Sequence, residues 1–171
     1  TEVPEPEPLP VFVKHPFLRI CSMNICKFKK NRESTNEQFL GILEVLSKMD
    51  VVMFSEVAAT NDEHLKQNQI FAKILTDFSN DGRSFHTCSS APSRVYDAEG
   101  RGTGQPEVHV CFFKEPLQCK GFRTWHSTSV GGDHVVFDHA PLTVVLDLPD
   151  FDSQILVTSV HLPPGSNNRE R

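Results

Sequence analysis

The first half of the chain alternates short apolar runs with longer amphipathic segments. The apolar runs at 18–25 and 51–57 have the length of buried strands. Capping boxes beginning at Thr35 and Thr60 introduce two segments whose apolar residues recur at helical spacing. With a strand-like run at 84–89, this pattern predicts strand, helix, strand, helix and strand. It is typical of an α/β layer with two helices on one face of a sheet.

The helical spacing disappears after residue 89. We predict a polar, glycine-rich loop over 90–106, followed by a series of strands separated by breakers such as Gly131-Gly132 and Pro149-Asp150. The predicted strands cover 107–114, 117–125, 134–137, 142–148 and 155–161. The fold class is therefore α/β (α+β) with a mixed sheet. Residues 1–16, rich in Pro and Glu, are predicted to be a linker, and 17–171 a single domain.

Composition narrows the possible functions only modestly. The net charge of −5 argues against a broad basic surface for nucleic acid, but a metal-dependent phosphodiesterase tolerates it, because a cation offsets carboxylate charge locally. No apolar run reaches the length of a membrane span. The five cysteines form no C-x-x-C pair, which argues against a thiolate zinc site and favours a reducing, intracellular compartment, nuclear or cytoplasmic.

Two polar residues stand where strands end. Asn24 closes the first predicted strand and Glu56 closes the second. Either residue alone would be read as an ordinary strand terminus entering a loop. Because the two strands flank one crossover, however, their carboxyl ends are expected to lie side by side. Amide and carboxylate oxygens are ligands that Mg²⁺ prefers, so the pair predicts a site for Mg²⁺ or Mn²⁺.

Glu107 and His161 are the candidates for proton transfer. Glu107 opens a predicted strand, where a solvated carboxylate is the ordinary interpretation. His161 ends the last predicted strand, where a structural histidine is the ordinary interpretation. The functional hypothesis is that Glu107 orients the imidazole of His161, which acts as general acid or base.

Five motifs in this order resemble the endonuclease/exonuclease/phosphatase superfamily, and most closely its deoxyribonuclease I-like branch. They are L-R-I-C-S-M-N-I, D-V-V-M-F-S-E-V, Q-P-E-V-H-V-C-F-F, F-D-H-A-P and L-V-T-S-V-H-L-P-P. The resemblance implies the amino-terminal half of a four-layered sandwich, in which two facing sheets have helices outside. It also implies a Mg²⁺-dependent phosphodiesterase or nuclease, with Asn24 and Glu56 at the metal and Glu107 paired with His161.

The chain departs from that family in two respects. The family's G-D-x-N and S-D-H motifs are absent from the 171 residues, so we expect half of the active site to be missing and this chain to be inactive alone. Several arginines of the branch are also replaced, by Cys26, by Ala58 and, within F-D-H-A-P, by His139. Cysteine and alanine cannot bind phosphate bidentately. The remaining candidate phosphate contacts are His139 itself, Arg94 and Arg101 in the polar loop.

Two functions remain open on these grounds. The first is an enzyme that cleaves nucleic acid or another phosphodiester once the missing carboxyl-terminal half, or a partner chain, completes the site. The alternative is a non-catalytic, nuclease-like binding or interaction module. Because the chain ends short of the family's second half, we also expect the second sheet not to form, leaving an apolar sheet face for that half or partner to cover.

Overall fold

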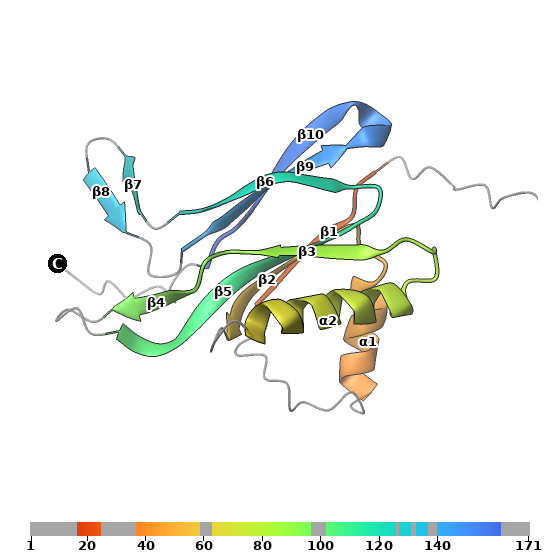
Figure 1. The fold of residues 1–171 in the computed structure, drawn as a ribbon, viewed down its shortest axis with the longest axis horizontal. Helices are drawn as coiled ribbons and strands as arrows, with labels where there is room; N and C mark the ends of the chain where they lie inside the picture. The colour runs from red at the N-terminus through yellow and green to blue at the C-terminus, as the bar shows by residue number, and fades with distance from the viewer. Residues whose placement is uncertain are drawn as a thin grey trace, which may run out of the picture.

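The described residues stack in three layers: two helices, a five-stranded sheet and a three-stranded sheet (Figure 1). The structure is a computed structural model that describes residues 17–24, 37–58, 63–96, 102–125, 127–130, 133–136 and 140–161. The first sheet has the strand order β1 (Ile20–Asn24), β2 (Val51–Ala58), β5 (Gly102–Lys114) and β3 (Phe85–Ser89), and β4 (Ser93–Tyr96) also pairs with β5. Only β1 and β2 are parallel. The predicted mixed α/β class is therefore observed.

The two helices cover one face of this sheet. They are α1 (Glu37–Leu46) and α2 (Glu63–Phe78). Leu43 and Leu46 of α1, and Phe71 and Leu75 of α2, are buried against apolar side chains of β2 and β5. The helical stripes predicted from the sequence thus form the first core.

A second sheet covers the other face, contrary to the expectation that it could not form. Its strand order is β10 (Ser153–Ser159), β9 (Leu142–Leu148) and β6 (Gln118–Thr124), all antiparallel. Alternate residues of β9 point inward and are buried against Val51, Met53, Cys111 and Phe113 of the first sheet. The expectation failed because the three strands of this chain suffice to bury that face.

The bare surface lies instead on the outside of the second sheet. Leu156 of β10 is exposed there, at 71%, and it pairs with Val145, which alternates outward along β9. No helix in the described ranges has the length and apolar character needed to cross a membrane.

Three other features differ from the sequence-based expectation. The predicted loop at 90–106 contains β4 and the beginning of β5, because β5 extends past its apolar core to pair with β4. Strand β7 (Ser127–Val130) was not predicted, and it forms a hairpin with β8 (Asp133–Val136). A 3₁₀ turn, η1 (Pro149–Phe151), followed by the left-handed Asp152, joins β9 to β10.

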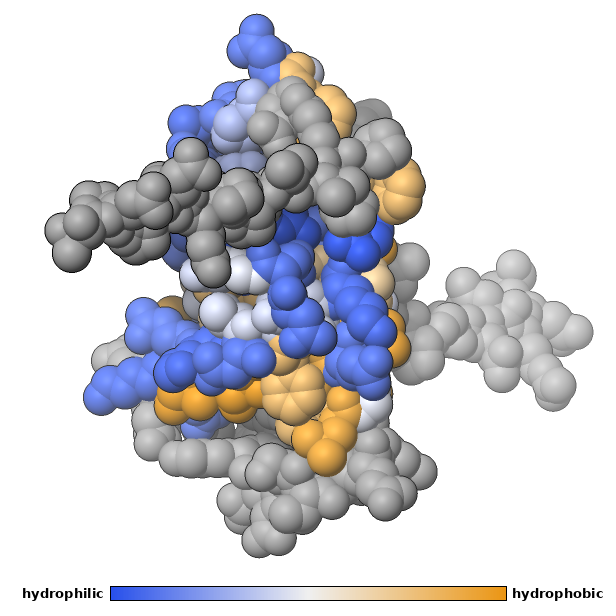
Figure 2. All heavy atoms as spheres, turned by 90° about the vertical axis from the view of Figure 1, so that its right-hand side faces the viewer, coloured by the Kyte–Doolittle hydropathy of each residue, from blue (hydrophilic) through white to orange (hydrophobic). Residues whose placement is uncertain are grey.

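Charged side chains gather at the end of the sheet where β2 begins. Asp50 is buried, and its two oxygens accept hydrogen bonds from the Arg19 backbone N–H at 2.9 Å and from Arg83 Nη2 at 3.1 Å. Arg83 also pairs with Asp81 at 2.7 Å, and the almost fully buried Lys114 reaches Asp81 at 3.1 Å. Figure 2 views the molecule from this end, where hydrophilic residues form a band across the middle. The network compensates charges that burial alone would destabilise.

We predict that Asp50→Ala lowers the free energy of unfolding by on the order of 3 kcal/mol, because it leaves Arg19 and Arg83 without their shared counter-ion. Asp77→Ala is the control, since among the described residues Asp77 pairs only with Lys73, at an exposed position on α2, and its change should stay below about 1 kcal/mol. Urea denaturation measures both variants. Equal losses of unfolding free energy in the two variants would show that the buried ion pairs of Asp50 stabilise the fold no more than the exposed pair of Asp77 does.

The stability that Asp81 contributes should depend on pH. Burial alone would raise its pKa, but hydrogen bonds from Ser79, Arg83 and Lys114 together outweigh burial and hold the pKa well below its usual value of 3.8. The folded-state pKa is thus below the unfolded one. The carboxylate therefore stabilises the protein above that usual value and loses this effect as the pH falls toward the folded-state pKa.

We expect the difference in unfolding free energy between wild type and Asp81→Asn to shrink as the pH is lowered from about 7 to about 3. Denaturation curves recorded across that range test this expectation. A difference that stays constant would mean that the ionisation of Asp81 is not linked to folding.

Candidate active site

The opposite end of the first sheet brings Asn24 and Glu56 together. Strands β1 and β2 run parallel with Asn24 opposite Ser55, which places Glu56 one residue beyond the last pair. Asn24 Nδ2 donates a hydrogen bond to Glu56 Oε1 at 2.7 Å. The amide and the carboxylate, 32 positions apart in sequence, thus lie side by side where the two strands end.

Glu56 has an unusual backbone conformation. Its φ is 59°, in the left-handed region that side-chain-bearing residues seldom adopt. It lies within an irregularity of the β2–β5 pairing, between Phe54 and Val57. Such bulges redirect a side chain out of the regular alternation of a strand. Here the bulge lets Glu56 contact residues from β1 and from the second sheet at once.

His161 comes from the second sheet. It lies two residues beyond Ser159, the last residue of β10, and its Nε2 is 2.8 Å from Glu56 Oε1. Both side chains are largely shielded, at 17% exposure for His161 and 14% for Glu56. An ionised carboxylate only accepts hydrogen bonds, so Nε2 carries the proton of this contact. Glu56 therefore joins Asn24 of one sheet to His161 of the other.

Glu107 lies at the same end of the first sheet. It pairs with Ala58 of β2, two residues beyond Glu56, and its side chain is half-buried. Along β5, Cys111 and Phe113 face the second sheet, and the alternation of a strand places Glu107 on that face too. That is the face from which His161 arrives. The pairing of Glu107 with His161 stays a prediction.

His109 is a residue that the sequence analysis did not identify. It is buried in β5, and its Nδ1 lies 2.7 Å from Ser159 Oγ, which is also buried. This hydrogen bond joins the two sheets two residues before His161 and so fixes where that imidazole emerges. The available signal was weak: His109 shares the inward face of Glu107 and Cys111, but nothing in the sequence places Ser159 opposite it.

The candidate phosphate contacts are described only in part. His139 and Arg101 lie outside the described residues, and for Arg94 the structure describes only the backbone, in β4. The segment after His139 is placed, however. Ala140 N–H donates to Ser93 Oγ at 3.3 Å, and Ser93 pairs with Glu107 across β4 and β5. The F-D-H-A-P motif therefore ends beside Glu107.

The chemistry of these side chains fits a hard divalent cation. Asn24 and Glu56 already present amide and carboxylate groups in contact, and Mg²⁺ is commonly held by one or two carboxylates together with water and phosphate oxygens. The four predicted residues include no thiolate, which a softer metal would favour. Among the described residues, no cluster of three or more His, Cys, Asp or Glu side chains is arranged to hold a metal. The chain thus offers part of a coordination sphere.

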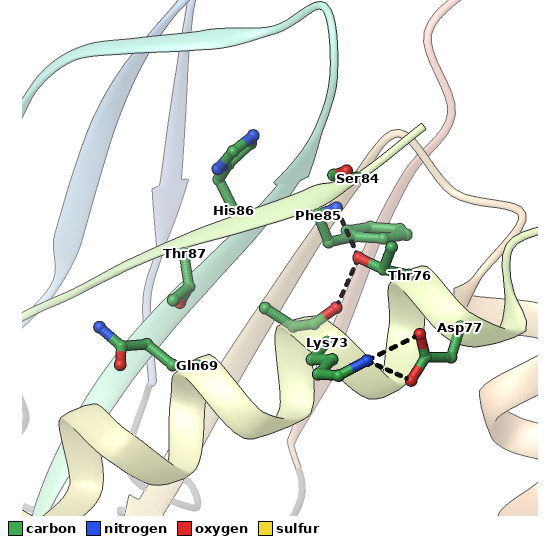
Figure 3. A pocket seen from close by; sticks show the side chains of 9 residues that line it. Gln69, Lys73, Thr76, Asp77, Ser84, Phe85, His86 and Thr87 are labelled. Carbon is green, nitrogen blue, oxygen red and sulfur yellow. Dashed lines mark hydrogen bonds and ion pairs between the residues drawn. The ribbon is translucent and has the colours of Figure 1, made fainter. Parts of the chain in front are cut away.

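A groove of about 400 Å³ runs between α2 and β3, at the edge of the first sheet (Figure 3). Its lining includes the exposed ion pair of Lys73 with Asp77. Thr76 Oγ1 in its wall accepts a hydrogen bond from Phe85 N–H at 2.9 Å. None of the four predicted site residues lines this groove. This groove is therefore separate from the group of side chains around Glu56.

The left-handed backbone at Glu56 should lower the stability of any variant that keeps a side chain at this position. We predict that Glu56→Gly unfolds with a free energy about 1 kcal/mol higher than Glu56→Ala, because only glycine adopts this φ without a steric penalty. Comparing two variants that both lack the carboxylate removes its hydrogen bonds from the comparison. At Thr158, an exposed position of β10, the same pair of substitutions should rank in the opposite order. An alanine variant as stable as the glycine variant at position 56 would contradict the assignment of strain.

Comparison with known proteins supports the architecture. No family model matches the sequence, and no curated protein gives a significant match. Among solved structures, an endonuclease/exonuclease/phosphatase family protein from Leptotrichia buccalis C-1013-b matches with a TM-score of 0.54 and 10% identity. The match covers 89% of this chain and 57% of that chain, so the chain corresponds to little more than half of the solved protein. The resemblance predicted from the motifs is thus confirmed for the fold: the chain has the architecture of an endonuclease/exonuclease/phosphatase protein.

Proposed function

We propose that this chain carries part of the active site of a Mg²⁺-dependent (or Mn²⁺-dependent) phosphodiesterase of the nuclease type. The observation that supports it most is the convergence on Glu56 Oε1 of Asn24 Nδ2, at 2.7 Å, and His161 Nε2, at 2.8 Å. A hydrolytic site of this class needs an oxygen donor set and a proton-transfer group within reach of one phosphate. In this proposal Asn24 and Glu56 supply the oxygen donors, and the adjacent imidazole of His161 is the proton-transfer group.

Each residue has a distinct role in this proposal. Asn24 and Glu56 would hold the cation, which when bound neutralises charge on the phosphate oxygens. His161 would transfer a proton at its Nε2, the atom already directed into the site. Glu107 would orient that imidazole from β5, and the bond between His109 and Ser159 would keep the end of β10 in place. Arg94, Arg101 and His139 are the proposed contacts to the nucleic acid or other phosphodiester.

The remaining groups would come from outside these 171 residues. The solved protein with this fold is longer, and this chain covers 57% of it. We propose that a carboxyl-terminal half or a partner chain completes the site and covers the outer face of the second sheet, where Leu156 is exposed. The chain by itself is expected to be inactive.

We predict that, in the complete protein, His161→Asn lowers the rate of phosphodiester cleavage by about 10²- to 10⁴-fold, the usual contribution of a general acid or base. Glu56→Gln should raise the Mg²⁺ concentration needed for half-maximal rate, because it removes the carboxylate charge. Assays use plasmid DNA, RNA and a small phosphodiester, each with Mg²⁺, with Mn²⁺ and with EDTA.

The surface pair of His86 and Glu115 provides the matched control. Its Nε2–Oε1 distance is 3.1 Å, but both side chains are about half exposed and lie outside the site. His86→Asn and Glu115→Gln should leave cleavage unchanged. Wild-type rates in the Glu56 and His161 variants would reject the assigned roles. A complete protein that hydrolyses none of the substrates with either metal would instead support the alternative, a non-catalytic binding module.

A further inference from the structure

Three cysteines from different strands meet between the two sheets. Cys88 lies opposite Cys111 in the β3–β5 pairing, and both belong to the face that packs on the second sheet. Cys119 of β6 packs into the same interlayer core from the other side. The thiols of Cys111 and Cys119 both influence the pKa of the Cys88 thiol. The fold thus assembles a thiol cluster that the candidate active site does not use.

The cluster lies at the rim of the interlayer space. β3 is the last strand of the first sheet and β6 the last strand of the second, and Figure 1 shows β6 running above β3. Cys88 and Cys119 are half-buried, whereas Cys111 is fully buried. Small solutes can therefore reach Cys88 and Cys119 more readily than Cys111.

Cys88 has two possible disulfide partners, Cys111 beside it in the first sheet and Cys119 on the facing sheet. Ser90 N–H donates to His109 O, and Glu115 N–H donates to Ser84 O, so even-numbered residues of β3 form the hydrogen-bonded pairs with β5. Cys88 and Cys111 are one such pair, in which the side chains stand farther apart than in the intervening pairs. Cys111 is fully buried in the core, whereas Cys119 is half-buried like Cys88 and packs on the same core from the facing sheet, so we take Cys119 as the partner of Cys88.

The three thiols differ in acidity. A hydrogen bond with Cys111 lowers the pKa of Cys88, against the opposing effect of burial. Burial and the charge of Cys88 raise the pKa of Cys119. The hydrogen bond to Cys88 and burial raise the pKa of Cys111 well above its usual range. The thiolate, which is the reactive form, therefore develops first at Cys88.

We propose that Cys88 and Cys119 form a peroxide-sensitive thiol pair whose oxidation links the two sheets by a disulfide. In the first step the Cys88 thiolate attacks hydrogen peroxide, the O–O bond breaks, and Cys88 sulfenic acid forms as hydroxide leaves and takes up a proton to become water. In the second step the Cys119 thiol condenses with the sulfenic acid and releases a second water molecule. The protein loses two electrons and two protons, and one peroxide is reduced to two waters. This inference does not depend on the proposed hydrolase activity.

The test is treatment of the purified, reduced protein with hydrogen peroxide, followed by thiol titration and non-reducing peptide mapping. We expect the loss of two free thiols and a linked peptide pair, lighter by two hydrogens, that joins Cys88 to Cys119. Cys119→Ser should instead accumulate sulfenic acid at Cys88, trapped by dimedone, and Cys88→Ser should abolish both products. Cys21→Ser is the matched control, because Cys21 packs against the helix-side core, and it should leave the linkage unchanged.

Several results would overturn the proposal. A disulfide between Cys88 and Cys111 would show that Cys119 is not the condensing thiol. A Cys119 disulfide that persists in Cys88→Ser would show that Cys88 is not the thiol that peroxide oxidises. The absence of both a linkage and dimedone labelling at Cys88 in the wild-type protein would reject the site altogether. Circular dichroism of each serine variant checks that the fold is retained, and the wild-type mapping decides the question independently of the variants.

Discussion

The alternation of side chains along two central strands governs the whole arrangement. β2 and β5 lie side by side in the middle of the first sheet, and both of their faces are buried. One set of their side chains packs on the helices and the other set on the second sheet. Because a one-residue slip would exchange these sets, the register of this pair is strongly specified. The thiol cluster, His109 and Glu107 all lie between the sheets for this reason.

The two ends of the same strands have opposite electrostatic characters. At one end, Asp50, Asp81 and their arginine and lysine partners neutralise one another. At the other end, Glu56 is met by an amide and an imidazole, neither of which carries a permanent positive charge. The first arrangement stabilises the fold. In the second, the carboxylate contacts groups without a permanent charge, and the left-handed backbone at Glu56 is a local cost of placing it there.

Much of this architecture was predictable because it follows from local patterns. Helical spacing predicted both helices, and apolar runs predicted β1, β2, β9 and β10 within a few residues. Asn24 and Glu56 could be placed together because parallel strands joined by one crossover end at the same edge. What the sequence did not reveal depends on contacts between distant segments. The second sheet, the pairing of β4 with β5 and the His109–Ser159 hydrogen bond all need tertiary partners that carry no periodic signal.

The candidate site is divided between layers, with Asn24, Glu56 and Glu107 on the first sheet and His161 beyond the last strand of the second. The apolar side chains between the layers, such as Val144 and Leu146, therefore act as spacers that set how far the imidazole stands from the carboxylate. A misplacement of about 1 Å can cost a reaction two orders of magnitude. Removing one methyl group from a buried side chain between the sheets, at a position that touches no substrate, would then lower activity more than it lowers the stability of the fold.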